Sequence, residues 1–438
     1  MNRVYEHETR LHAADQREDI AGFLLSDEIK EAILRRIYSG SDGTTGIDPD
    51  LFRQMYDVLD NAIGKSFGVG VKWGEADREF LTELRHNAAV FAAFKAHREQ
   101  NDIASMLIDE DGNRRSFDAF WKATEPIIGS YNVNWLRTEY NAAIRNARTA
   151  RRWMTYVKDA DLFPNLRWLP SRAADPRYEH RLLWNTVRAI TDPWWETTYP
   201  GCLWNCQCDV EQTADPITHI GDTPVDPNGV PTNPSSPGKM RAPGLSRNPY
   251  YLRSLFSEDH PYVPQSCSSC RIGKTIGNLC NAGKDCFQCS EVERALWNMR
   301  ISMKLEEAKK SVLDELTKSG LINADIRNSS LDKRRFSMSK DVYDRYMAHT
   351  RNSEEAWILL TLPSNLHRLR NRVKSELGEN KNLLDPPQIR NIERKRERGV
   401  KYYNIYEYEY MGTVWFIGME VSKIDKKWKE EPYFIKMK

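Results

Sequence analysis

The segment from Leu169 to Val210 limits the possible folds of this chain more than any other feature. Its sequence, LPSRAADPRYEHRLLWNTVRAITDPWWETTYPGCLWNCQCDV, follows neither the period of a helix nor that of a strand. Large aromatic side chains need packing partners, and prolines fix the backbone angle φ. We therefore expect a rigid, buried scaffold built from loops, in which tryptophans alternate with prolines and cysteines: Trp184, Trp194, Trp195, Trp204, Pro170, Pro176, Pro193, Pro200, Cys202, Cys206 and Cys208.

The three clustered cysteines allow two interpretations. Cys202, Cys206 and Cys208 could bind a metal with His180 or His219 as the fourth ligand, but no spacing rule selects either histidine. Buried structural cysteines are the favoured interpretation. Redox catalysis of the thioredoxin type is not expected, because no strand and helix of the required kind precede the cysteines.

Length and charge indicate more than one domain. A chain of 438 residues exceeds one ordinary hydrophobic core, so two or three domains are expected. From Arg300 to Lys438 there are 29 Lys and Arg against 21 Asp and Glu, a net charge of +8, which leaves 35 against 41 upstream. The basic C-terminal part suits an acidic partner such as nucleic acid, and a solvated lysine-rich surface is the equal alternative.

The chain carries no sequence signal for a membrane. Its start, MNRVYEHETRLHAADQRED, has no apolar core, and no apolar run approaches the roughly 18 residues that span a bilayer. We therefore expect neither a standard secretion signal nor a membrane partner.

Residue spacing predicts helices in the first part of the chain and a small α+β domain at its end. Residues 26–100 are predicted to be helical, with starts at Ser26 and at Asp48-Pro49, and a long helix is predicted from Trp135 to Val157. One face of that helix is basic and suits solvent or DNA, through Arg145, Arg148, Arg151 and Arg152. A connecting helix is predicted from Glu291 to Lys318.

The last domain is expected to place helices before an antiparallel sheet. The runs DVYDRYMAHT and SNLHRLRNRVKSELG are the helix candidates, and VKYYNIYEYEY, TVWFIGMEV and PYFIKMK are the strand candidates. The Met411-Gly412 pair predicts a hairpin between the first two strands.

A proline-rich segment separates these parts. Ten of the 21 prolines lie between Pro216 and Pro264. The segment has too few apolar residues to offset the entropy lost on folding, so it is predicted to be a linker or an extended arm.

Two cysteine pairs follow the linker with the spacing of a structural zinc site. Cys267-x2-Cys270 and Cys286-x2-Cys289 are fifteen residues apart, and Cys280 between them is a possible substitute ligand. Four thiolates around Zn²⁺ would fold a segment that is otherwise too polar to fold alone. The alternatives are disulfides, which an oxidising environment would favour, and free cysteines.

Several motifs in the first part resemble the bacteriophage Mu F-like minor head proteins. The resemblance begins near Trp135, continues weakly to His260-Pro261-Tyr262, and rests on PRYEH at 176–180, DPWW at 192–195, YPG at 199–201 and WNCQC at 204–208. Many relatives have His before Pro-Asn-Cys-Arg-Cys, whereas this chain has Leu203 and Trp204, with Gln207 in place of the Arg. The resemblance implies a head morphogenesis protein near the portal, with portal and head proteins as partners, located in the virion or the host bacterial cytoplasm.

The resemblance and the residue patterns together divide the chain into six predicted parts. The fold class is multidomain, with a mainly α-helical N-terminal part, an irregular Trp/Pro/Cys-rich domain and a small α+β domain that ends in an antiparallel sheet. The parts are a helical region at 1–130, a Mu F-like domain at 131–212, a linker or arm at 213–264, a cysteine-rich segment at 265–290, a connecting helix at 291–320 and an α+β domain at 321–438.

The sequence from Phe336 onwards loosely resembles nuclease modules of the barnase, EndoU, colicin and RelE superfamily that often follow Mu F-like domains. The resemblance implies metal-independent RNA cleavage. Such cleavage needs a base, an acid and a cation beside the phosphorane, and the candidate residues are His349, His367, Lys340, Arg351 and Ser337. Each histidine by itself is more often a surface or core residue, so this prediction requires that folding brings them together.

Two functions therefore remain open from the sequence. In the first, the chain is a minor capsid protein that carries a C-terminal RNase module. In the second, it is an effector RNase resembling polymorphic toxins, with the Mu F-like part for packaging or delivery, RNA as substrate and an immunity protein as partner.

Overall fold

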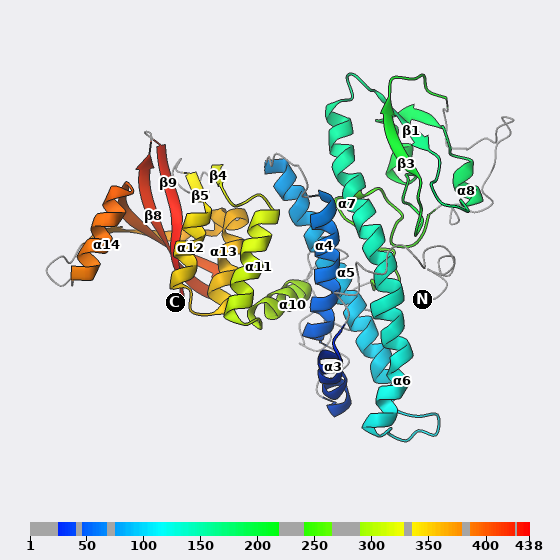
Figure 1. Ribbon diagram of the computed structural model, residues 1–438, viewed down its shortest axis with the longest axis horizontal. Helices are drawn as coiled ribbons and strands as arrows, with labels where there is room; N and C mark the ends of the chain where they lie inside the picture. The colour runs from blue at the N-terminus through cyan, green and yellow to red at the C-terminus, as the bar shows by residue number, and fades with distance from the viewer. Residues whose placement is uncertain are drawn as a thin grey trace. The chain divides into compact units, whose positions relative to one another are not determined.

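A computed structural model describes residues 25–40, 46–67, 75–218, 241–264, 290–327, 335–378, 386–424 and 427–438. The chain divides into two compact units, residues 1–295 and 296–438 (Figure 1). The predicted fold class is confirmed: the first unit is mainly helical with an irregular Trp-rich part, and the second is an α+β domain. The boundaries of the six predicted parts stay predictions.

The first unit is built on long helices that lie side by side. Helix α4 (Pro49–Phe67) packs against both α5 (Glu75–Ala104) and α7 (Leu136–Lys158), as Figure 1 shows. Helices α3 (Asp27–Ser39) and α6 (Phe117–Gly129), a 3-10 turn (Ser105–Leu107) and a π-helical turn (Ser130–Trp135) complete this part. Within the described part of the chain, no helix is long and apolar enough to cross a bilayer.

Local signals set the starts of two helices as predicted. The Ser26 side chain accepts a hydrogen bond from the backbone N–H of Ile29 and caps α3. Asp48 Oδ1 accepts hydrogen bonds from the N–H groups of Asp50 and Leu51 at the start of α4. Both side chains satisfy backbone donors that the helix itself leaves free.

Helix α7 matches the predicted long helix. Its buried face includes Leu136, Tyr140 and Ala147, whereas Val157 near its end is 46% exposed. Trp153 is fully buried in the tryptophan core on this side of the helix.

The Trp-rich segment packs against the C-terminal half of α7. A three-stranded antiparallel sheet of order β2-β1-β3 is formed by β1 (Asn165–Leu169), β2 (Val187–Ala189) and β3 (Asp209–Thr213), and the short helix α8 (Tyr178–Arg181) and a 3-10 turn (Pro193–Glu196) connect the strands. Its core holds Trp153, Trp168 and Trp195, all fully buried. The ring centroids of Trp153 and Trp195 are 5.7 Å apart in an edge-on arrangement. The expected aromatic scaffold is thus present.

The end of the predicted linker belongs to this core. Residues 219–240 lie outside the described residues, but 241–264 include helix α9 (Pro249–Leu252), which packs against α7. Asn248 donates through Nδ2 to the carbonyl oxygen of Trp195 over 3.1 Å, and Asn87 on α5 bonds the backbone of Leu255 and Phe256. These buried hydrogen bonds and the apolar side chains at 255 and 256 hold residues 241–264 in the folded unit. The prediction of a linker up to 264, which was based on composition, is therefore wrong for this part.

The second unit contains a six-stranded sheet of order β4-β5-β9-β8-β7-β6. Strands β7 (Val400–Tyr410), β8 (Thr413–Ile424) and β9 (Lys427–Met437) form the predicted antiparallel meander, and Met411 and Gly412 form its turn with φ of 50° and 76°. The sheet also includes β4 (Ala324–Arg327), β5 (Arg335–Met338) and β6 (Arg370–Glu376). Because β5 pairs parallel with β9, the sheet is mixed, not purely antiparallel.

Helices α11 (Leu305–Lys318), α12 (Lys340–His349) and α13 (Ser353–Asn365) share one hydrophobic core with this sheet (Figure 1). The predicted connecting helix is in fact two, α10 (Ser290–Ile301) and α11, with a break at 302–304. The predicted helix SNLHRLRNRVKSELG is wrong over most of its length, because residues 370–376 pair with β7 as an exposed edge strand. Helices α13 and α14 (Pro386–Glu397) were not predicted.

Candidate metal centre

His180 reaches the Trp-rich core from the short helix α8. Pro176 and Arg177 precede this helix, and the His180 side chain is buried with 2% exposure. The indole ring of Trp168 stands edge-on to the imidazole with 5.4 Å between centroids. The packing of this aromatic pair fixes the orientation of the imidazole.

The cysteine loop at 201–208 is shaped by its backbone and by one arginine of α7. Gly201 has φ of 121° and Asn205 has φ of 55°, conformations that glycine and asparagine tolerate best. Arg145 donates through its guanidinium to the carbonyl oxygens of Cys206 over 2.8 Å and of Gly201 over 3.2 Å. The predicted basic face of α7 therefore contributes at least one side chain to the fold of this loop.

A second arginine of α7 holds the other end of the loop. Arg152 makes an ion pair of 2.5 Å with Asp209 and donates to the carbonyl oxygen of Val210 over 2.5 Å. Asp209 and Val210 begin β3, directly after Cys208. The loop is thus fixed at both ends to one helix.

The loop places three sulfur atoms around the two ring nitrogens of His180. His180 Nδ1 lies 3.2 Å from Cys206 Sγ and 3.7 Å from Cys208 Sγ, while Nε2 lies 3.7 Å from Cys202 Sγ. All three cysteines are free thiols and are buried. The ligand atoms of His180, Cys206 and Cys208 lie within 4.8 Å of one another.

The surroundings shift the pKa values of this cluster. Burial opposes protonation of His180, but the sulfurs of Cys206 and Cys202 outweigh it and raise the pKa of the imidazole to about 10. The hydrogen bond from Cys208, together with His180 and Arg145, holds the pKa of Cys206 well below its usual value against the effect of burial. The same hydrogen bond and burial raise the pKa of Cys208. Cys206 is therefore the more acidic of these two thiols.

The three cysteines are buried, as the favoured interpretation expected, and folding brings them to His180, one of the two histidines considered as a further metal ligand. The sequence left the histidine open between His180 and His219, and His219 lies outside the described residues. Folding brings His180 to the cysteines from a position 22 residues before Cys202. No spacing rule covers such a distance, so only the PRYEH motif could have drawn attention to this histidine.

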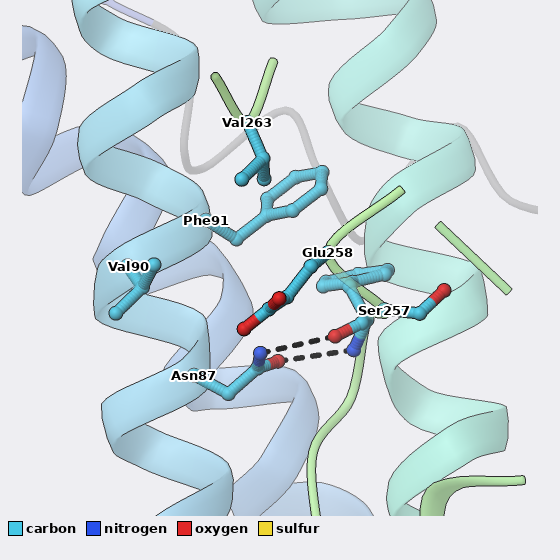
Figure 2. Close-up of a pocket in the computed structure, with 7 residues that line it drawn as sticks. Asn87, Val90, Phe91, Ser257, Glu258 and Val263 are labelled. Atoms are coloured by element: carbon cyan, nitrogen blue, oxygen red, sulfur yellow. Dashed lines mark hydrogen bonds between the residues drawn. The ribbon is translucent and has the colours of Figure 1, made fainter. Parts of the chain in front are cut away.

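The described part of the chain contains a small pocket in the first unit, which lies between α5 and the segment 256–263 (Figure 2). Asn87, Phe91, Phe256 and Glu258 are among its lining residues, and Asn87 bonds to the backbone of Phe256. It leaves only about 10 Å³ for the centre of a water-sized molecule, which is room for about one water.

The predicted zinc ligands Cys267, Cys270, Cys286 and Cys289 lie outside the described residues, as does Cys280. That prediction therefore stays a prediction.

The described residues of the second unit include all five predicted catalytic residues but show no hydrogen bond or ion pair that joins any two of them. Ser337 is buried within β5, opposite Asp325 of β4. Lys340 makes an ion pair with Asp344 at the start of α12. Arg351, His349 and His367 are exposed, and His367 follows α13 in a 3-10 turn.

His349 has neighbours that the sequence did not indicate. Its ring lies edge-on to Tyr433 with 4.8 Å between centroids, and Lys395 Nζ lies 3.6 Å from the centroid of the same tyrosine ring. Lys395 donates to the hydroxyl of Tyr403 over 2.7 Å and lies 3.2 Å from a carboxylate oxygen of Glu420, which is 2% exposed. Burial and the charge of Lys395 lower the pKa of His349.

Comparisons with known proteins point to one class. A stretch of 105 residues, 24% of this chain, is 31% identical to the "Putative capsid assembly protein F" of Escherichia phage Mu. That stretch spans 21% of the phage protein, so most of the relative has no counterpart in the match. No protein-family model matches the chain, and no solved structure matches it. The chain is thus similar, over about a quarter of its length, to a phage capsid assembly protein.

Proposed function

We propose that this protein acts in phage head morphogenesis, as a minor head protein near the portal of the particle. The observation that carries this proposal is the 31% identity to the capsid assembly protein of phage Mu. The described part of the first unit agrees with a structural role, because Arg145 and Arg152 of α7 fix both ends of the cysteine loop. Portal and head proteins are its proposed partners, and the virion is its proposed location.

The test is the composition of phage particles made with and without the protein. We expect the chain in purified particles, its co-purification with the portal, and a loss of filled heads when it is deleted. Re-expression of the intact chain should restore the heads. Normal heads from the deletion strain, together with absence of the chain from wild-type particles, would contradict the proposal.

The surroundings of His349 favour a second candidate, an RNA-cleaving activity of the second unit. The lowered pKa of His349 favours the neutral imidazole, the form that a general base requires, and the cation of Lys395 lies beside the same tyrosine ring. RNA would be the substrate, and a cell that makes the enzyme would need an immunity protein. The first unit would then package or deliver this effector.

This candidate is tested with the purified full-length chain and cellular RNA in a chelating buffer. We expect RNA fragments, and a loss of about 100-fold or more in rate with His349→Ala. The matched control is Glu409→Gln, an exposed position on β7 that should leave the rate unchanged. His367→Ala shows whether the second predicted histidine takes part. No cleavage by the unchanged chain would rule out the activity.

A further inference from the structure

We propose that His180, Cys206 and Cys208 bind one Zn²⁺ ion that ties α8 to the cysteine loop. His180 lies on α8 and the two cysteines lie on the loop, and all three side chains are buried beside the tryptophan core. One imidazole and two thiolates form a soft donor set of the kind that selects zinc over Mg²⁺ or Ca²⁺.

The distances fit a tetrahedral ion. With Zn–N of about 2.1 Å and Zn–S of about 2.3 Å, a tetrahedral angle separates nitrogen from sulfur by about 3.6 Å. His180 Nδ1 lies 3.2 Å from Cys206 Sγ and 3.7 Å from Cys208 Sγ. An adjustment of a few tenths of an ångström therefore admits the ion between the three atoms.

Cys202 has a different role from the other two cysteines. Its Sγ lies 3.7 Å from Nε2, the ring nitrogen on the opposite side of the imidazole from the proposed ion. Histidines that bind a metal through one nitrogen commonly donate the other N–H to an acceptor, which fixes the ring. Cys202 is placed to be that acceptor, so the described residues supply three ligands to the ion.

The loop is held in this form independently of an ion. Arg145 binds the carbonyl oxygens of Gly201 and Cys206, and Trp168 packs edge-on against the imidazole. Two thiolates and one Zn²⁺ have no net charge, so the bound ion would add no uncompensated charge to this core.

The test is the zinc content of the full-length chain by mass spectrometry, with folding checked by circular dichroism. Cys206→Ser and Cys208→Ser should each lower the zinc content by one equivalent relative to the unchanged chain. Cys202→Ser should retain the zinc, and Cys208→His, which keeps a zinc-binding donor, should retain it in part. Zinc content that stays unchanged in the folded Cys206→Ser chain would overturn the proposal.

The cysteines at 267–289 could bind a second ion, so a background without them separates the two sites. In a chain with Cys267, Cys270, Cys286 and Cys289 all changed to Ser, we expect one equivalent of zinc. Cobalt in its place should give the absorption of a tetrahedral site with thiolate charge transfer, and adding Cys206→Ser should abolish it. A folded chain in this background that holds no zinc and gives no cobalt spectrum would also overturn the proposal.

Discussion

Arg145 of α7 donates a hydrogen bond of 2.8 Å to the carbonyl oxygen of Cys206, 61 residues later in the chain. The guanidinium also reaches the carbonyl oxygen of Gly201 over 3.2 Å. One side chain of a long helix thus holds both sides of the loop that carries the cysteines. This contact joins the helical part of the first unit to its candidate metal centre.

Replacement of this arginine should loosen the loop. Arg145→Ala removes two hydrogen bonds to backbone carbonyls, so we expect a loss of about 2–3 kcal/mol in the free energy of unfolding, measured by urea denaturation. The matched control is Arg148→Ala on an exposed turn of the same helix, which should change stability by less than about 0.5 kcal/mol. Equal effects of the two substitutions would show that Arg145 has no special role.

Replacing Gly201 should destabilise the fold, because both its backbone conformation and its close neighbours exclude a side chain. Its φ is 121°, and an added Cβ would lie 2.9 Å from Nε of Arg145. Gly201→Ala is expected to cost about 1–3 kcal/mol in thermal or urea unfolding. The contrasting change is Gly129→Ala in α6, where a Cβ meets no atom within 4 Å, and a gain of about 0.5–1 kcal/mol is expected. If Gly129→Ala also lowered the free energy of unfolding, the special requirement for glycine at 201 would be contradicted.

Stability of the first unit should depend on pH through two buried groups. Burial raises the pKa of Glu99 to about 8, so the folded chain holds a proton that the unfolded chain releases, and stability falls as pH rises from about 4.5 to about 8. Burial and the charge of Lys95 lower the pKa of His260 to about 3, so stability falls as pH drops from about 6.5 to about 3.

The two effects together place the maximum stability between about pH 4.5 and about pH 6.5. Urea midpoints across this range measure the profile. Glu99→Gln should flatten the decline between about pH 6.5 and about pH 8 and leave the acid side unchanged. A decline that persists in this variant would assign the effect to other groups.

Close packing in the sheet of the second unit gives a further prediction. A Cβ at Gly418 of β8 would lie 2.2 Å from the Phe434 ring on β9. Gly418→Ala should therefore cost about 1–3 kcal/mol in urea denaturation, because the ring must move. Combining it with Phe434→Leu should reduce the added cost, whereas additive losses would show that the two positions are independent.

The hairpin glycine should tolerate substitution better. A Cβ at Gly412 would meet no atom within 4 Å, so Gly412→Asn should lower the free energy of unfolding by less than about 1 kcal/mol in urea denaturation.

The sequence predicted elements well where short-range interactions decide them. Ser26 caps its helix through a contact three residues away, and Met411-Gly412 turns the chain within the hairpin itself. Prediction failed where a distant partner decided the structure. Residues 370–376 became a strand because β7 lies beside them.

For the candidate site, the sequence determined which side chains were available: a tract with three cysteines, two alternative histidines and aromatic residues that require a core. The tertiary structure decided which of these side chains meet. It placed His180 between Cys202, Cys206 and Cys208, and it placed Lys395 beside His349. Backbone propensity and capping act over a few residues and can be predicted from the order of amino acids. The meeting of side chains dozens of residues apart depends on how whole helices and strands pack, and only the folded chain defines it.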